Sequence, residues 1–73
     1  MTNKPLPEPT PARVRRAREK ANLTQPEAAA LVHLAHGIRW SEYERGKHAI
    51  SPAAWELFLY KTGQRELVLE LDA

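Results

Sequence analysis

The chain has 73 residues, no cysteine, and eleven lysines and arginines against nine acidic residues. A chain of this length forms one small domain with a modest core, so we expect it to act through its surface rather than through a deep pocket. The lack of cysteine excludes disulfides and thiolate metal sites, and no apolar run approaches the ~18 residues of a membrane span. The polar, proline-rich N-terminus is unlike a signal peptide, and we expect a cytoplasmic protein.

Charge differs between the two halves of the chain. Residues 11–48 contain eight lysines and arginines and four glutamates, whereas residues 49–73 contain two basic and four acidic residues. The basic half is suited to face a polyanion. The same distribution is also compatible with ordinary surface charge, so charge alone leaves both interpretations open.

The first predicted elements are a tail and a helix. Residues 1–9 include three prolines and little apolar surface, which predicts a disordered or extended tail. A helix is predicted to follow, with Thr10 as N-cap and Pro11 at the first helical position, and to end near Ala21. Its apolar face consists of Val14, Ala17 and Ala21.

Two short helices are predicted next. The pattern Thr24-x-x-Glu27 is a capping box that begins a helix over residues 25–32. After a turn over residues 33–36, a third helix is predicted over residues 37–45, with Gly46 as its C-cap. Trp40 and Tyr43 are expected to face inward, with either Leu34 or Ile38 beside them.

The chain then restarts at Ser51 and Pro52, which predict a fourth helix to about Thr62. Its buried face is expected to carry Trp55, Phe58, Leu59 and Thr62, with Tyr60 exposed. Residues 64–71 are apolar enough to pack, and the pattern allows either a strand or a helical turn. The predicted fold class is therefore all-α: a compact domain of four helices, with a possible fifth element.

Three short motifs carry a resemblance. They are Arg18, Leu23-Thr24-Gln25, and Glu44-Arg45-Gly46. In this order and spacing they resemble the lambda-repressor-like, or XRE-type, helix-turn-helix DNA-binding family, over about residues 12–63. The stretch between Val32 and Trp40 is one residue longer than the usual turn, so site positions are counted back from Glu44.

The resemblance implies that residues 37–45 form the recognition helix of a double-stranded DNA-binding domain. Base-reading residues are expected at His36, Gly37, Ile38 and Glu42, with Arg39 and Ser41 beside them. The chemistry agrees, because arginine can donate two hydrogen bonds to guanine and a carboxylate can accept one from cytosine. For Arg39 the alternatives are a phosphate contact or a solvated side chain. For Glu42 the alternative is an exposed charge paired with Arg39 or Arg45.

Two further sets of residues follow from the resemblance. The expected phosphate contacts are Gln25, Arg45, Lys47 and His48. Arg18 and Glu44 are expected to form a structural ion pair that fixes the angle of the recognition helix. The alternative for this pair is two unrelated surface charges.

Other kinds of site are weakly supported. His33-x-x-His36 supplies only two ligands and lacks a third, so no metal site is expected. The aromatic residues have the spacing of a helical core rather than of a stacking surface. No nucleophile and base are combined, so we expect neither an enzyme nor a cofactor or small-molecule ligand.

The resulting functional hypothesis is a transcriptional regulator, most simply a repressor or autoregulator of phage or plasmid type that occludes a promoter. A module of this size usually binds as a homodimer to a palindromic operator. The candidate dimer contacts are Leu67, Val68, Leu69 and Leu71. The alternatives are a protein-interaction module, such as an antitoxin or adaptor, and a non-specific nucleoid-type binder.

Overall fold

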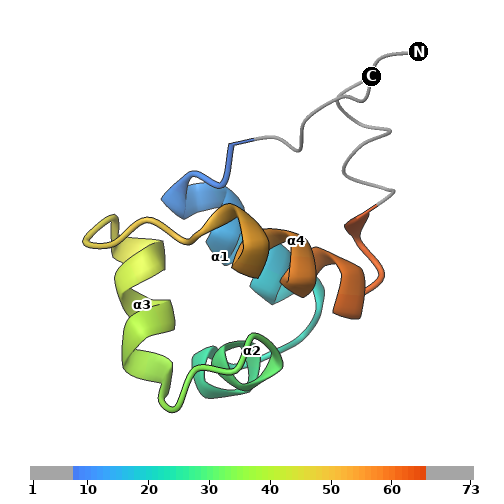
Figure 1. Cartoon of the computed structure of the whole chain (residues 1–73), viewed down its shortest axis with the longest axis horizontal. Coiled ribbons are helices and arrows are strands. Elements are labelled where there is room, and N and C mark those ends of the chain that lie inside the picture. The colour runs from blue at the N-terminus through green and yellow to red at the C-terminus, as the bar shows by residue number, and fades with distance from the viewer. Residues whose placement is uncertain (1–7, 66–73) are drawn as a thin grey trace.

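The computed structural model describes residues 8–65 as four helices and contains no strand among them (Figure 1). The helices are α1 (Pro11–Lys20), α2 (Gln25–Leu31), α3 (Gly37–Arg45) and α4 (Pro52–Lys61). The all-α class is thus confirmed. Every helix begins at the expected residue. Three of them, α1, α2 and α4, end one residue earlier than expected, because the residue placed last in each is its C-cap.

Side-chain caps explain where three of the helices begin. Thr10 Oγ1 accepts a hydrogen bond from Arg13 N at 3.2 Å, and Ser51 Oγ accepts one from Ala54 N at 3.1 Å. At α2 the predicted capping box is formed in both directions, since Thr24 N also donates to Glu27 Oε1 at 2.8 Å. These contacts satisfy first-turn N–H groups that have no partner inside a helix.

Two non-glycine residues in the left-handed region end the first two helices. Asn22 has φ 59° after α1, and His33 has φ 64° after α2. In each case the next residue donates back to the last turn: Leu23 N to Arg18 O at 3.2 Å, and Leu34 N to Ala29 O at 2.9 Å. This is the Schellman arrangement, which satisfies carbonyl groups of the last turn and ends the helix.

The core lies where the four helices meet. Its largest fully buried side chains are Trp40, Phe58, Leu59 and Val14. The rings of Trp40 and Phe58 are 4.7 Å apart between centroids, and Ala28 and Ala29 are fully buried beside them. Small residues on α2 therefore allow α3 to approach closely, while α3 and α4 supply the aromatic volume. Leu34, rather than Ile38, packs against this core.

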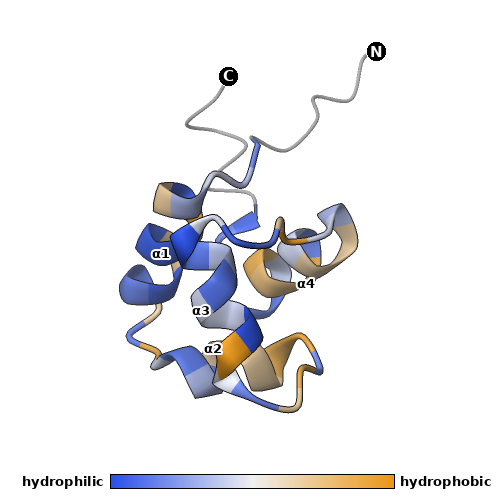
Figure 2. Ribbon diagram, turned by 90° about the vertical axis from the view of Figure 1, so that its left-hand side faces the viewer, coloured by the Kyte–Doolittle hydropathy of each residue, from blue (hydrophilic) through white to orange (hydrophobic). Residues whose placement is uncertain are grey.

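The arrangement leaves one side of α3 uncovered. In Figure 1, α3 stands at one edge of the molecule, with α2 below it and α4 in front of α1. In Figure 2, where the molecule is turned by 90° about the vertical axis, α3 faces the viewer between α1 and α4, and α2 lies beneath it. The C-terminal end of α4 is tied back by Gln64, whose Nε2 donates to Ala17 O at 3.0 Å. Residues 66–71, and with them the choice between strand and helix, lie outside the described residues, as does most of the predicted tail.

Candidate nucleic-acid interface

The inner side of α3 is organised around the carboxylate of Glu44. Arg18 on α1 donates from Nε to Oε2 at 2.6 Å and from Nη2 to Oε1 at 3.1 Å. Trp40 donates from Nε1 to Oε2 at 2.6 Å, and Gln25 on α2 donates from Nε2 to Oε1 at 3.2 Å. A single carboxylate therefore joins α1, α2 and α3.

This cluster is well shielded from solvent. The Glu44 side chain is 5% exposed and the Arg18 side chain 16%. Burial alone raises the pKa of Glu44, but the hydrogen bonds from Arg18, Trp40 and Gln25 outweigh it and lower the pKa below its ordinary value. The hydrogen bond to Glu44 raises the pKa of Arg18. Both groups are therefore charged at neutral pH and hold α3 against α1.

The sequence predicts only part of this cluster. Arg18 and Glu44 meet, as the resemblance implies. The sequence places Trp40 in the core and Gln25 at a phosphate. In the structure the side chains of both residues donate hydrogen bonds to Glu44. The spacing of Trp40 and Glu44, one turn apart on the same helix, is the signal that could have linked them.

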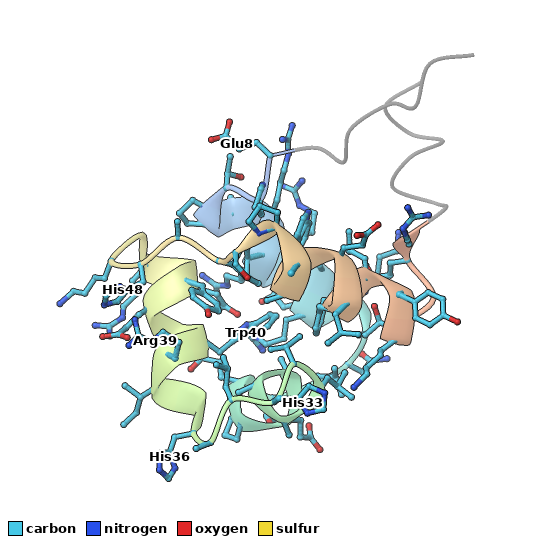
Figure 3. All side chains as sticks on the ribbon, in the orientation of Figure 1. Glu8, His33, His36, Arg39, Trp40 and His48 are labelled. Atoms are coloured by element: carbon cyan, nitrogen blue, oxygen red, sulfur yellow. The ribbon has the colours of Figure 1, made fainter. Side chains whose placement is uncertain are left out.

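The outer side of α3 carries most of the expected base-reading residues. Ile38 is 69% exposed, and the side chain of Arg39 is 47% exposed. In Figure 3, His36 points away from the lower end of α3 and Arg39 lies on its outer side, while Trp40 points inward. Ser41 and Glu42 are half-buried on the same helix. This face is free of the core packing that holds α3 from behind.

Two nitrogen-bearing side chains of the protein lie close to the Glu42 carboxylate. Its Oε1 lies 3.5 Å from Arg39 Nε and 3.8 Å from His48 Nε2. The ion pair with Arg39, one of the two alternatives for this carboxylate, is thus present in the structure. Pairing with Arg39 reduces the repulsion that a lone carboxylate would exert on phosphates.

A shallow groove separates the beginnings of α2 and α3. It is lined by Gln25, Pro26, Gly37, Ile38, Ser41 and Arg45. A Cβ atom on Gly37 would lie 2.9 Å from Pro26 N, which is closer than real Cβ contacts. Glycine at this position therefore permits the close approach of α3 to α2. This structural role is separate from the base-reading role that the resemblance implies for Gly37.

The remaining expected phosphate contacts follow α3. Arg45, Lys47 and His48 are exposed. Gly46 has φ 77° and ends the helix, and Lys47 N donates to Glu42 O at 2.9 Å, so the turn is held by backbone hydrogen bonds. The three side chains are thus displayed beside the outer face of α3 at its C-terminal end.

Residues 8–65 contain neither a candidate metal site nor a membrane-spanning helix. No group of three histidine or acidic side chains within this range could hold a metal ion. None of the helices there has the length and apolar character needed to cross a membrane.

Comparison with known proteins agrees with this architecture. No curated protein and no solved structure matches the chain. A family model described as a helix-turn-helix domain matches residues 12–68, which is more than half of the chain and covers the four helices except for Pro11, the first residue of α1. The chain therefore belongs to the helix-turn-helix domain family.

Proposed function

We propose that this protein is a sequence-specific double-stranded DNA-binding transcriptional regulator of the cytoplasm. The observation that carries the proposal is the division of α3 into two faces. Its inner face is fixed by Glu44 and Trp40, and its outer face displays Ile38 and Arg39 to solvent. A helix that is anchored on one face and exposed on the other is suited to major-groove recognition.

Basic residues support an anionic partner. Arg39, Arg45 and Lys47 all lie on α3 or directly after it, and each is exposed. Contacts of this kind to phosphates position a protein on a duplex, while base edges supply specificity. The residues proposed to read bases are His36, Gly37, Ile38, Arg39, Ser41 and Glu42. Those proposed to contact phosphates are Gln25, Arg45, Lys47 and His48.

The mode of regulation is the finer part of the proposal. A single small module covers roughly 600–1,000 Å² of protein surface on DNA, so a homodimer on a palindromic operator is the simplest route to useful affinity. Repression or autoregulation then follows from blocking a promoter. The proposed dimer contacts, Leu67, Val68, Leu69 and Leu71, lie outside the residues that the structure describes.

Selection of bound duplexes from a random pool tests the proposal directly. Recovery of a palindrome with half-sites about 34–36 Å apart supports a dimeric regulator. The selected site should be bound ~10³-fold or more tightly than scrambled DNA of the same length. Equal affinity for both would instead favour a non-specific binder.

The Arg39→Ala variant separates DNA reading from the protein-interaction alternative. Because the Arg39 side chain is on the exposed face of α3, its loss should leave the fold intact and weaken binding to the selected site. If the cellular activity of the protein persists unchanged in Arg39→Ala, an antitoxin or adaptor role replaces the proposal.

A further inference from the structure

We propose that Ile38 contacts the C5-methyl group of a pyrimidine in the major groove, a group that thymine and 5-methylcytosine share. The inference rests on the proposed DNA binding. It adds that one base of the bound DNA sequence must present a C5-methyl group to the protein. Ile38 is the second residue of α3 and is 69% exposed. A single exposed apolar residue is common on protein surfaces, so the argument depends on what surrounds it.

The surroundings of Ile38 form an apolar groove with polar edges. Pro26 and Gly37 line it beside Ile38, and Gln25, Ser41 and Arg45 supply its polar edges. Gly37 lies directly against Pro26, and because it is a glycine it places no Cβ between Ile38 and the first turn of α2. The groove therefore offers contact to a small apolar group whose neighbours are polar.

The major groove presents one apolar group of this kind. Base edges there carry hydrogen-bond donors and acceptors, and among the unmodified bases the methyl group is the one on C5 of thymine, which 5-methylcytosine also carries. An isoleucine has no donor or acceptor, so placing it against a polar base edge would desolvate that edge without replacing its hydrogen bonds. A C5-methyl group avoids this penalty and gains apolar burial.

The basic residues near Ile38 favour DNA over an apolar protein surface as the partner that occupies the groove. Arg39 and Arg45 lie on the same helix as Ile38, and Lys47 follows that helix. A polyanion is attracted by this arrangement, whereas an apolar protein surface would have to desolvate the cations around a single isoleucine.

The proposal makes binding sensitive to one methyl group. Burying a methyl contributes about a fourfold gain in affinity for each half-site, by the usual free energy for one buried carbon. A cytosine that becomes methylated at the position facing Ile38 should gain affinity by the same factor. The protein would then respond to C5 methylation of its site.

The test uses the full chain and duplexes recovered from a random pool. Each thymine of the selected site is replaced in turn by deoxyuracil, which removes only the methyl group, and the Kd is measured. A second pair of duplexes carries cytosine or 5-methylcytosine at the thymine position found to matter. Ile38→Ala is the test variant, and Tyr60→Ala is the matched control, because Tyr60 is equally exposed, at 73%, but lies on α4 outside the groove.

The expected result is one thymine position at which deoxyuracil weakens binding about fourfold. This difference disappears in Ile38→Ala and persists in Tyr60→Ala. A gain with 5-methylcytosine as well identifies both methyl sources, and a response to thymine alone identifies thymine as the source. Equal affinity for thymine and deoxyuracil at every position overturns the proposal, as does an Ile38→Ala variant that keeps the preference. Failure to recover any bound duplex overturns the proposed function itself, which is a distinct outcome.

Discussion

Trp40 and Glu44 lie one turn apart on α3, and the indole Nε1 of Trp40 donates a 2.6 Å hydrogen bond to the Glu44 carboxylate. The same indole ring packs 4.7 Å from the ring of Phe58, centroid to centroid. One residue thus belongs both to the apolar core and to the polar cluster that fixes α3. This double role leads to the first prediction.

Trp40→Phe should destabilise the protein by about 1.5–3 kcal/mol through the lost hydrogen bond to a charged group, in addition to the loss of ring volume. Urea unfolding followed by circular dichroism measures the change. Trp55→Phe is the matched control, because Trp55 is also buried but its Nε1 has no hydrogen-bond partner in the described structure. Equal losses in the two variants would contradict the role given to the indole N–H.

Breaking the ion pair should have a larger effect. Arg18→Met leaves a buried carboxylate without its cation, and a loss of about 3–5 kcal/mol is expected in the free energy of unfolding. Replacing both partners, as in Arg18→Met with Glu44→Leu, should cost less than the sum of the single changes, which a double-mutant cycle measures. Arg15→Ala is the control, since its ion pair with Glu19 is solvent-exposed and worth at most about 0.5 kcal/mol. Additive losses in the cycle would argue against direct coupling.

Stability should fall with acidification because of Glu44. Its pKa is lower in the folded protein than its ordinary value of 4.5, so the folded state releases this proton more readily than the unfolded state. The resulting stabilisation is fully present above pH 4.5 and is lost as the pH falls through the lower pKa of the folded state. Glu44→Gln removes this contribution, so its free energy of unfolding should depend less steeply on pH in acid. An unchanged slope in Glu44→Gln would show that other carboxylates account for the acid sensitivity.

Gly37→Ala gives a prediction whose sign is informative. Alanine is favoured over glycine in a helix by about 0.5–1 kcal/mol, so the change would be stabilising if space allowed. The new Cβ would instead meet the backbone of Pro26 at 2.9 Å, and overpacking of this kind costs about 1–3 kcal/mol. Net destabilisation is expected in thermal or urea unfolding. A more stable Gly37→Ala protein would mean that α2 and α3 separate readily.

The phosphate contacts predict a change in salt dependence. If Lys47 neutralises one phosphate, Lys47→Ala should lower the slope of log K against log salt concentration by about one unit and weaken binding to all duplexes alike. Filter binding or fluorescence anisotropy over a salt series measures the slope. Arg65→Ala provides the control, because Arg65 follows α4 and pairs with Glu56. A slope unaffected by Lys47→Ala removes this residue from the interface.

The helices themselves could be predicted from local chemistry. Thr10, Thr24 and Ser51 each cap a helix with their own side chain, so a few adjacent residues determine where α1, α2 and α4 begin. The predicted ends of these three helices lie one residue beyond the observed ends, because a C-cap residue shares part of the helical backbone geometry. The buried positions of Trp40 and Phe58 likewise follow from helical periodicity.

The polar contacts of the core could not be predicted in the same way. Periodicity places Trp40 inside but says nothing about where its Nε1 points, and the direction depends on Glu44 and Arg18 arriving from elsewhere in the fold. Gln64 illustrates the limit more strongly. It is 7% exposed and donates to Ala17 O across 47 residues of sequence, and no local pattern around it indicates this partner.

Anchoring α3 through Glu44 has a consequence for how such a domain can diversify. The groups that set the angle of the helix and the groups proposed to contact DNA lie on opposite sides of the same nine residues. Ile38 or Arg39 can therefore be exchanged without disturbing the scaffold. If the proposed DNA contacts hold, the preferred DNA sequence can be changed by substituting a few outward side chains while the Glu44 cluster stays the same.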